Sequence, residues 1–400
     1  MRKQWLPRSK HAVTMALLIS ALLVSTKGYT DTVRFHAWGG SAQVNGYLQW
    51  VANQLSDQGI TLQHVKLADT SDAVSRVLTE KAAGNTDNGS VDLIWINGEN
   101  FAAMKKHGLL RQNWVKTIPN FSLTNPAQNP AMETDFGEPT LGMEAPWGKA
   151  SMVFYFRKRY LDEYDVSPPT SITSLLSFAK AMPGRFTYPL PSDYLGISFL
   201  KYAALALNHD RRDVFYKPAS IKALNMITPS LWAYLDTLHP LMWREGDYMV
   251  RQASQLQRLV GNGELALSFS FTAAEIPSAV ERFDLPKDIR TYAMHDGSLA
   301  NVHFIGIAFN TPHFNAAKQV VDFMLSPQAQ AQKKSISVWG DDTVLDMAVL
   351  TGEQQALFTS NQLHPSAIAP DSTTPLIAEP HSSWSDALRE AWFARYGTRY

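Results

Sequence analysis

The stretch VDLIWINGENFAAMKKHGLL, residues 91–110, decides the fold. It opens with a short, largely apolar run rich in β-branched and aromatic side chains, which is typical of a strand covered on both faces in a parallel sheet. Asn100 is a suitable N-cap for a helix that starts at Phe101, and Gly108 is suited to end that helix. We therefore expect residues 97–100 at the carboxyl end of a parallel strand, where open α/β sheets bind ligands. An ordinary strand-to-helix turn without a ligand fits these residues equally well.

The preceding segments extend this pattern. Residues 33–37 alternate as in a strand, residues 47–55 have helical spacing, and residues 60–69 form a second strand-like run. Residues 71–84 read as a capped helix that ends at a glycine. Together with the strand and helix of residues 91–110, this order predicts a doubly wound α/β layer.

A second compositional regime follows. Residues 112–146 are rich in Pro, Asn and Thr and have little periodicity, whereas residues 151–156 resemble a strand. Helical spacing then occupies much of residues 198–260, and a further strand is expected at residues 264–269. A chain of 400 residues with 45% hydrophobic content buries a large core, and this length favours two domains over one.

The first 30 residues are distinct from the rest. Four basic residues among the first ten precede an apolar segment, residues 12–24, and the first acidic residue is Asp31. This pattern predicts a signal peptide over residues 1–30 with cleavage between Ser25 and Asp31; an uncleaved anchor is the alternative, although the segment is short for a membrane span. Five of the 36 basic residues lie in this leader, so the remaining chain is mildly acidic, which argues against a nucleic-acid partner.

The chain contains no cysteine. We therefore expect no disulfides, and no lipid attachment at the end of the signal peptide, because that attachment requires a cysteine. The sequence predicts a protein that is exported to the periplasm, is not a lipoprotein and binds no cofactor.

Four segments are characteristic in their order and spacing. They are VDLIWINGENF…GLL in residues 91–110, APWGKASMVFYFRKRYLDEYDVSPPTSITSLL in residues 145–176, GNGELALSFS in residues 261–270, and VHFIGIAFNTPHFNAAKQVVDFMLSPQAQ in residues 302–330. In this order the chain resembles the solute-binding proteins of ABC importers, specifically the type II group with maltose-, iron-, polyamine- and thiamine-binding members. The strings AWGGS, WINGEN, EAPWG, PGRFTYP and WREG place it nearest a subgroup of uncharacterised ligand.

The resemblance implies an α/β, two-lobed type II periplasmic-binding-protein fold, each lobe a sheet flanked by helices. The first lobe would comprise residues 31–146 plus 301–325, and the second residues 147–300 plus 326–400. The first crossover between the lobes would lie near residues 146–148 and the second near residues 299–301. A small solute would lie in the cleft between the lobes, which would close about a hinge. The protein would be a monomer without catalytic activity, and its partners would be the solute and the permease subunits at the inner membrane.

The resemblance also implies which residues line that cleft. Those expected from the first lobe and the first crossover are Trp38, Gly39, Gly40, Ser41, Asn97, Glu99, Asn100, Glu144 and Trp147. Those expected from the second lobe and the second crossover are Tyr188, Asp193, Tyr194, Ser268, Ser270, Phe271, Asn301 and His303.

Several of these residues also have a structural interpretation. Gly39-Gly40 would allow the backbone to approach a ligand and would expose N–H groups that favour an anion, but it also fits a tight turn. Trp147 would form a stacking wall between Pro146 and Gly148. Glu144 is interpreted either as a ligand carboxylate or as a solvated surface group. His303 lies on an alternating strand, where a hydrogen-bonded core histidine is the more usual case.

The ligand class stays open at this level. Aromatic rings with the carboxylates of Glu99, Glu144 and Asp193 fit an organic cation such as a thiamine-like or polyamine-like molecule, and rings with amides fit a sugar as well. His295-Asp296 gives no metal cage, so no metal is expected. A periplasmic carbohydrate-active enzyme would need two opposed carboxylates. The sequence has no nucleophile elbow, P-loop or HExxH motif. A scaffold with an empty cleft is the third alternative.

Overall fold

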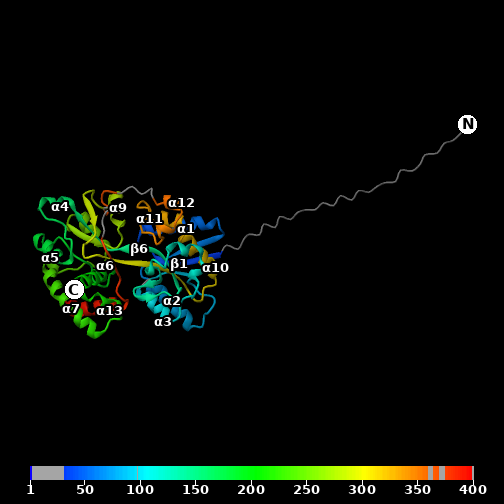
Figure 1. Ribbon diagram of the computed structural model, residues 1–400, viewed down its shortest axis with the longest axis horizontal. Helices are drawn as coiled ribbons and strands as arrows, with labels where there is room; N and C mark the ends of the chain where they lie inside the picture. Colours follow the sequence, from blue (N-terminus) through cyan, green and yellow to red (C-terminus); the bar gives the residue numbers. More distant parts are fainter. Residues whose placement is uncertain (2–30, 97, 359–363, 369–373, 399–400) are drawn as a thin grey trace.

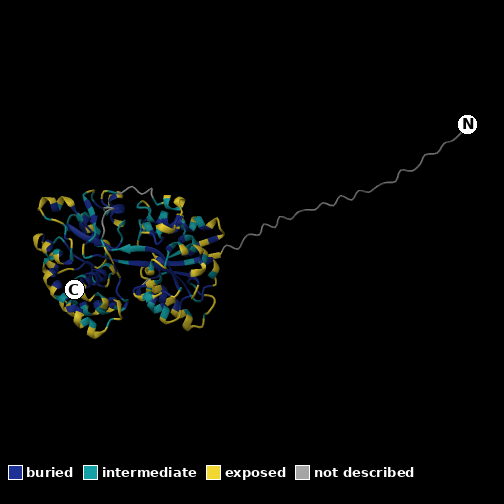
Figure 2. Ribbon diagram, in the orientation of Figure 1, coloured by how far each residue is buried: buried dark blue, intermediate teal, exposed yellow. Residues whose placement is uncertain are grey.

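The computed structural model describes residues 1, 31–96, 98–358, 364–368 and 374–398. Two α/β bodies lie side by side, and the long strands β6 and β10 run from one to the other (Figure 1). The buried residues are concentrated inside each body and along these connecting strands (Figure 2). The predicted signal peptide, apart from Met1, lies outside the described residues. Within the described part of the chain, no helix is long and apolar enough to cross a membrane.

The first lobe is built on a six-stranded sheet whose main path is β11-β10-β3-β1-β2, with β6 paired to β10. β1 runs parallel to β2 and β3, whereas β10 runs antiparallel to β3 and β6. The strands are β1 (Asp31–Trp38), β2 (Ile60–Leu67), β3 (Leu93–Ile96), β6 (Glu144–Ser151), β10 (Ser298–Ile307) and β11 (Leu376–Ala378).

Helices cover this sheet, and the strand sequences explain why. Val33, Phe35 and Ala37 on one face of β1 are fully buried, and His36 on the other face is also buried, as expected of a strand covered on both sides. The helices of this lobe are α1 (Ala42–Ser56), α2 (Ser71–Ala82), α3 (Gly98–Lys106), α10 (Phe314–Met324), α11 (Pro327–Lys334) and α12 (Gly352–Ala356).

The helix in the deciding stretch starts earlier than predicted. It begins at Gly98, so Asn100 lies inside its first turn and does not cap it. Gly98 adopts a φ of +58°, and its N–H donates to Oδ2 of Asp135 over 2.8 Å. A carboxylate from a distant segment therefore satisfies the helix start, which is the role that Asn100 was expected to have.

The second lobe has a small antiparallel sheet in the order β8-β7-β9. Its strands are β7 (Val153–Arg157), β8 (Leu267–Ser270) and β9 (Ile289–Tyr292). α6 is apolar almost all round and packs against α5, α7 and α13. The helices of this lobe are α4 (Lys158–Glu163), α5 (Ile172–Ala181), α6 (Tyr194–Leu207), α7 (Ile221–Leu238), α8 (Ser254–Gly261), α9 (Glu275–Glu281) and α13 (Ser383–Tyr396).

Short elements fill the regions that lacked periodicity. The hairpin β4 (Thr134–Asp135) and β5 (Glu138–Pro139) follows three 3-10 helices in the segment that precedes β6. The 3-10 helices are η1 (Val115–Thr117), η2 (Pro119–Thr124), η3 (Pro130–Glu133), η4 (His209–Tyr216), η5 (His239–Leu241), η6 (Trp243–Gly246) and η7 (Met347–Val349).

The C-terminal part of the chain divides differently from the sequence prediction, which assigned residues 326–400 to the second lobe. Trp339, Val344 and Leu350 belong to the hydrophobic core of the first lobe. Trp384 and Trp392 of α13 belong to the core of the second. The chain therefore stays in the first lobe after α10 and contributes to the second core only near its C-terminal end.

Candidate functional site

The parallel strands of the first lobe end at one edge of the sheet. Trp38, the last residue of β1, is 44% exposed there, and the N–H of Gly39 donates to the carbonyl of Leu67 at the end of β2 over 3.0 Å. A Cβ on Gly40 would lie 2.7 Å from the Trp38 ring, so only glycine fits this turn. The hydroxyl of Ser41 then accepts from the N–H of Val44 and caps α1. The Gly-Gly turn thus wraps an exposed indole ring at the strand ends.

Glu99 lies at the same edge, in the first turn of α3, and Asn100 beside it is half-buried. Oε1 of Glu99 is 3.7 Å from Nη2 of Arg389 on α13, so this contact joins the two lobes. Partial burial raises the pKa of Glu99, and the Arg389 guanidinium opposes that shift. Asn97, the first polar residue after β3, lies outside the described residues.

A buried polar cluster lies where the lobes meet. We call Asp135, Glu144, Tyr194, Lys201, Glu379 and Asn301 the junction cluster. The Lys201 ammonium on α6 is 2.6 Å from Oε2 of Glu379, which follows β11, and 5.0 Å from the centre of the Phe136 ring in the β4–β5 hairpin. The Phe136 carbonyl accepts from the N–H of Ser382 over 3.2 Å, so this hairpin is hydrogen-bonded to the C-terminal segment.

The carboxyl groups of the junction cluster outnumber their partners. Asp135 and Glu144 are each 1% exposed. Within the described residues, neither oxygen of Glu144 accepts a hydrogen bond, and the same holds for Oδ1 of Asp135 and Oε1 of Glu379. An ionised carboxylate without partners is costly in a dry interior. Burial accordingly raises the pKa of Asp135 and of Glu144 well above the usual range, and nearby carboxylates add to both shifts.

Tyr194 and Asn301 complete the junction cluster. The Asn301 side-chain amide donates to the Tyr194 hydroxyl over 2.7 Å, and the Tyr194 ring meets Phe271 edge to face at 5.2 Å. Tyr194 is 44% exposed overall while its hydroxyl points inward, so burial and the negative charge of Glu379 raise its pKa. Among the predicted site residues, the structure thus brings together Tyr194, Phe271 and Asn301. Asp135 acts electrostatically on both Glu144 and Tyr194 and so links Glu144 to this group.

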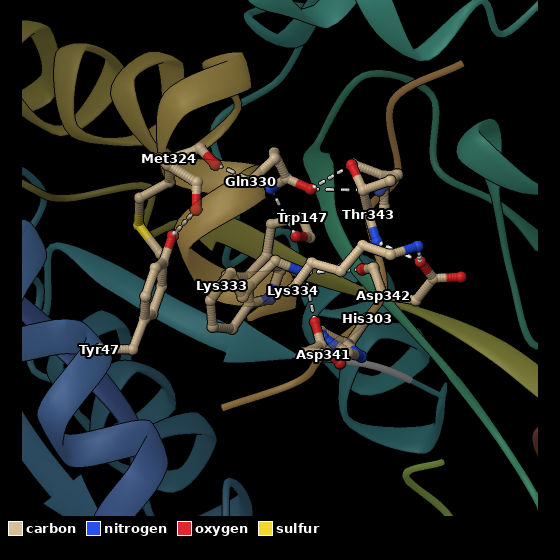
Figure 3. Close-up of polar contacts among 12 residues, drawn as sticks. Tyr47, Trp147, His303, Met324, Gln330, Lys333, Lys334, Asp341, Asp342 and Thr343 are labelled. Atoms are coloured by element: carbon tan, nitrogen blue, oxygen red, sulfur yellow. Dashed lines mark hydrogen bonds and ion pairs between the residues drawn. The ribbon is translucent and has the colours of Figure 1, made fainter. Parts of the chain in front are cut away.

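Trp147 and His303 do not lie where a cleft wall was expected. Trp147 is fully buried in the first core, with its ring centre 4.9 Å from Trp95 and 5.4 Å from Trp339. His303 is 4% exposed, and its Nε2 lies 2.9 Å from Oδ2 of Asp341 (Figure 3). Because both side chains are enclosed by packing and hydrogen bonds, we leave them out of the candidate site.

Three predicted residues of the second lobe have hydrogen-bond partners within the protein, and a fourth is enclosed in the sheet. The Tyr188 hydroxyl is 2.7 Å from Nε2 of His239 in the core. Asp193 caps α6 through Leu195 and also accepts from the N–H of Ala253, so both its oxygens are used. Ser268 is fully buried in β8. The hydroxyl of Ser270 is also buried and accepts from the N–H of Thr272 over 3.1 Å.

Sequence reasoning missed three members of the junction cluster: Asp135, Lys201 and Glu379. Lys201 had a visible signal, because it is the one charged residue in the apolar helix YLGISFLKYAALAL. Asp135 and Glu379 lie in segments without periodicity, and only the fold brings them together. Among the described residues, no group of three or more His, Asp and Glu side chains is placed to hold a metal ion.

Comparisons with known proteins agree with this architecture. A family model described as "Bacterial extracellular solute-binding protein" matches residues 49–356. Protein YnjB of Escherichia coli (strain K12) is 40% identical over 375 residues, which is 92% of each chain.

Two solved structures share the fold at low identity. The periplasmic binding protein AfuA from Actinobacillus pleuropneumoniae, with fructose-6-phosphate bound, has a TM-score of 0.61 at 12% identity and covers 91% of this chain and 98% of its own. The spermidine/putrescine ABC transporter substrate-binding protein PotD from Streptococcus pneumoniae has a TM-score of 0.61 at 14% identity. The match covers 92% of this chain and 99% of PotD. The predicted two-lobed fold is confirmed, and the chain belongs to the bacterial extracellular solute-binding protein family.

Proposed function

We propose that this chain is the periplasmic solute-binding component of an ABC importer and that its solute is a small organic cation held at the junction cluster. It would capture the solute between the lobes and deliver it to a membrane permease, without catalysis. Family membership supports the binding role. The shared fold with PotD, named for spermidine and putrescine, is compatible with a cationic solute.

The charge balance of the junction cluster supports the proposal that the solute is a cation. The junction cluster holds three buried carboxyl groups, from Asp135, Glu144 and Glu379, and one buried ammonium, that of Lys201, which pairs with Glu379. A cation would supply the missing charge and donate to the oxygens that lack partners. The rings of Phe136 and Tyr194 border the same place and offer faces for cation–π contact. An anionic solute would meet the same carboxyl groups and be repelled.

Movement of the lobes would admit the solute. Only β6 and β10 run as long strands between the bodies in the described chain, so we infer that closure bends these strands. Residues that contact across the junction, such as Glu99 and Arg389, would separate when the lobes open. The predicted crossovers, near residues 146–148 and 299–301, lie on these two strands.

A ligand screen tests the proposal. The chain from Asp31 onward is purified, and its unfolding midpoint is measured with thiamine, putrescine, spermidine, amino acids, sugars and metal salts. A ligand at about 100 times its dissociation constant adds about 2.7 kcal/mol, which raises the midpoint clearly. We expect an organic cation to do so, Glu144→Gln to weaken the effect, and the exposed Glu163→Gln to leave it unchanged.

Other outcomes would contradict defined parts of the proposal. A sugar that raises the midpoint while no cation does would keep the binding role and overturn the ligand class. Turnover of a glycoside by the purified chain would overturn the absence of catalysis and favour the carbohydrate-active alternative.

A further inference from the structure

Asp135 and Glu144 form a pair of carboxyl groups with an unusual lack of partners. Asp135 ends β4, and Glu144 begins β6. The only hydrogen bond that either carboxyl group accepts within the described residues comes from the N–H of Gly98, at Oδ2 of Asp135. Three buried oxygens of this pair therefore receive no hydrogen bond from the described residues and are available to a donor from a solute.

The cations near the pair are already engaged. From α3, the Lys105 ammonium is 3.1 Å from Oε2 of Glu138 on β5, and from α6 the Lys201 ammonium is 2.6 Å from Oε2 of Glu379. The negative charges of Glu138 and Glu379 raise the pKa of Asp135 further. The positive charge of Lys105 lowers the pKa of Glu144, but less than burial raises it. In the part of the chain that the structure describes, no ion pair thus joins a cation to either carboxyl group of the pair.

Two further titratable groups of the described chain lie near this place: His381, whose Nε2 is 3.3 Å from Oε1 of Glu138, and Tyr194, on which Asp135 acts. The pKa of Tyr194 lies well above 10, so it stays neutral and contributes no charge near neutral pH. Two adjacent carboxyl groups that are buried without counter-ions do not both ionise, because burial and mutual repulsion act in the same direction. The pair therefore holds a proton more readily than an exposed carboxyl group does.

We propose that the Asp135–Glu144 pair is a proton-exchanging cation subsite, at which an ammonium group of the solute replaces the proton that the pair holds when the site is free. This inference rests on the proposed function for the class of solute. In the exchange the carboxyl O–H bond breaks, the proton leaves to water, and the carboxylate pairs with the ammonium. One positive charge replaces another, so the buried site keeps its net charge.

The exchange predicts a pH-dependent affinity. Binding that releases one proton becomes up to tenfold tighter for each unit of pH, as long as the pH is below the raised pKa of the pair. Above that pKa the dependence disappears, because the pair is already ionised before the solute arrives.

The first experiment concerns the ligand-free protein. Because the folded state holds the proton more tightly than the unfolded state, the contribution of Glu144 to stability declines as pH rises from its unfolded pKa through the raised folded one. We expect the midpoint of urea unfolding of the wild type to fall between pH 5 and pH 8 relative to that of Glu144→Gln, and Glu163→Gln to follow the wild type. Parallel curves for wild type and Glu144→Gln would overturn the proton-holding pair.

The second experiment measures proton release. Putrescine, spermidine and thiamine are titrated calorimetrically in phosphate and in Tris buffer, whose different ionisation enthalpies reveal protons released on binding. We expect about one proton released per cation bound by the wild type and fewer for Glu144→Gln. Binding without release would overturn the exchange and leave the proposed function intact. Absence of binding by all three cations would instead contradict the ligand class and the exchange together.

Discussion

Two buried polar clusters in this protein use similar groups to different effect. In the first lobe, Lys333, Asp341 and His303 form what we call the core network, in which Oδ2 of Asp341 accepts from Lys333 and lies 2.9 Å from Nε2 of His303 (Figure 3). Lys333 also donates to the Asp342 carbonyl over 2.7 Å. In this network one carboxylate meets two nitrogen groups. In the junction cluster, three carboxyl groups meet one ammonium.

The difference separates a structural cluster from a functional one. The core network joins α11 to both crossover strands, because His303 lies on β10 and Lys149 of β6 pairs with Asp342 in an antiparallel bridge. Gln330 adds hydrogen bonds to the carbonyls of Trp147 and Met324. A network with complete pairing fixes a geometry, whereas one with unpaired buried groups has free energy to gain from a ligand.

The largest effect is expected from Lys333→Met. Lys333 is fully buried, and its removal leaves the Asp341 carboxylate without its ammonium, which typically costs about 3–5 kcal/mol of unfolding free energy. The matched control is Lys334→Met. The Lys334 side chain is 40% exposed and pairs with Asp342, so we expect a loss below about 1 kcal/mol. Urea unfolding measures both variants. Equal losses would show that the core network does not stabilise the lobe.

Lys201→Met applies the same change to the junction cluster. We expect a loss of about 1.5–3 kcal/mol at pH 8, because Glu379 loses its charged hydrogen bond in a buried site. Urea unfolding of the variant and the wild type measures the loss. An unchanged free energy of unfolding would show that the Lys201–Glu379 ion pair does not stabilise the junction cluster.

Gly148→Ala tests how tightly the crossover strands meet the core network. A Cβ on Gly148 of β6 would overlap Oδ2 of Asp341 and Nε2 of His303. We expect a loss of about 1–3 kcal/mol, because these buried groups must shift to make room. Gly46→Ala is the control: Gly46 lies inside α1 with open space around it, so alanine should stabilise by about 0.5–1 kcal/mol. An unchanged free energy of unfolding for Gly148→Ala would mean that the side chains of the core network shift at little cost.

The fold followed from local sequence where periodicity is strong. The apolar run that became β3, the helix that became α1 and the order of the first strands were readable, because alternation and helical spacing are local signals. The start of α3 could not be predicted in this way, because its first N–H donates to Asp135, which lies 37 residues later in the chain. A cap supplied by a distant segment leaves no mark in the helix sequence itself.

The candidate site was harder to read for the same reason. Trp147 lies between a proline and a glycine at a predicted crossover, which indicated a ring that faces the cleft. In the structure β6 continues through it, and its ring packs on Tyr47 and Trp339. Lys201 and Glu379 are 178 residues apart and meet only in the folded chain. Glu144 was identified by charge and position, whereas its lack of partners required the structure.

The smallest effect is expected from Tyr194→Phe. The substitution removes the hydroxyl that accepts from Asn301 and keeps the ring against Phe271, so we expect a loss of about 1 kcal/mol in urea unfolding. The substitution is more informative for binding. If the hydroxyl only positions Asn301, the affinity of Tyr194→Phe for the cation should fall little. If the ring face contacts the solute, Tyr194→Phe should keep its affinity and Tyr194→Ala should lose affinity. Equal affinities for all three proteins would place the solute away from α6 and remove Tyr194 from the site.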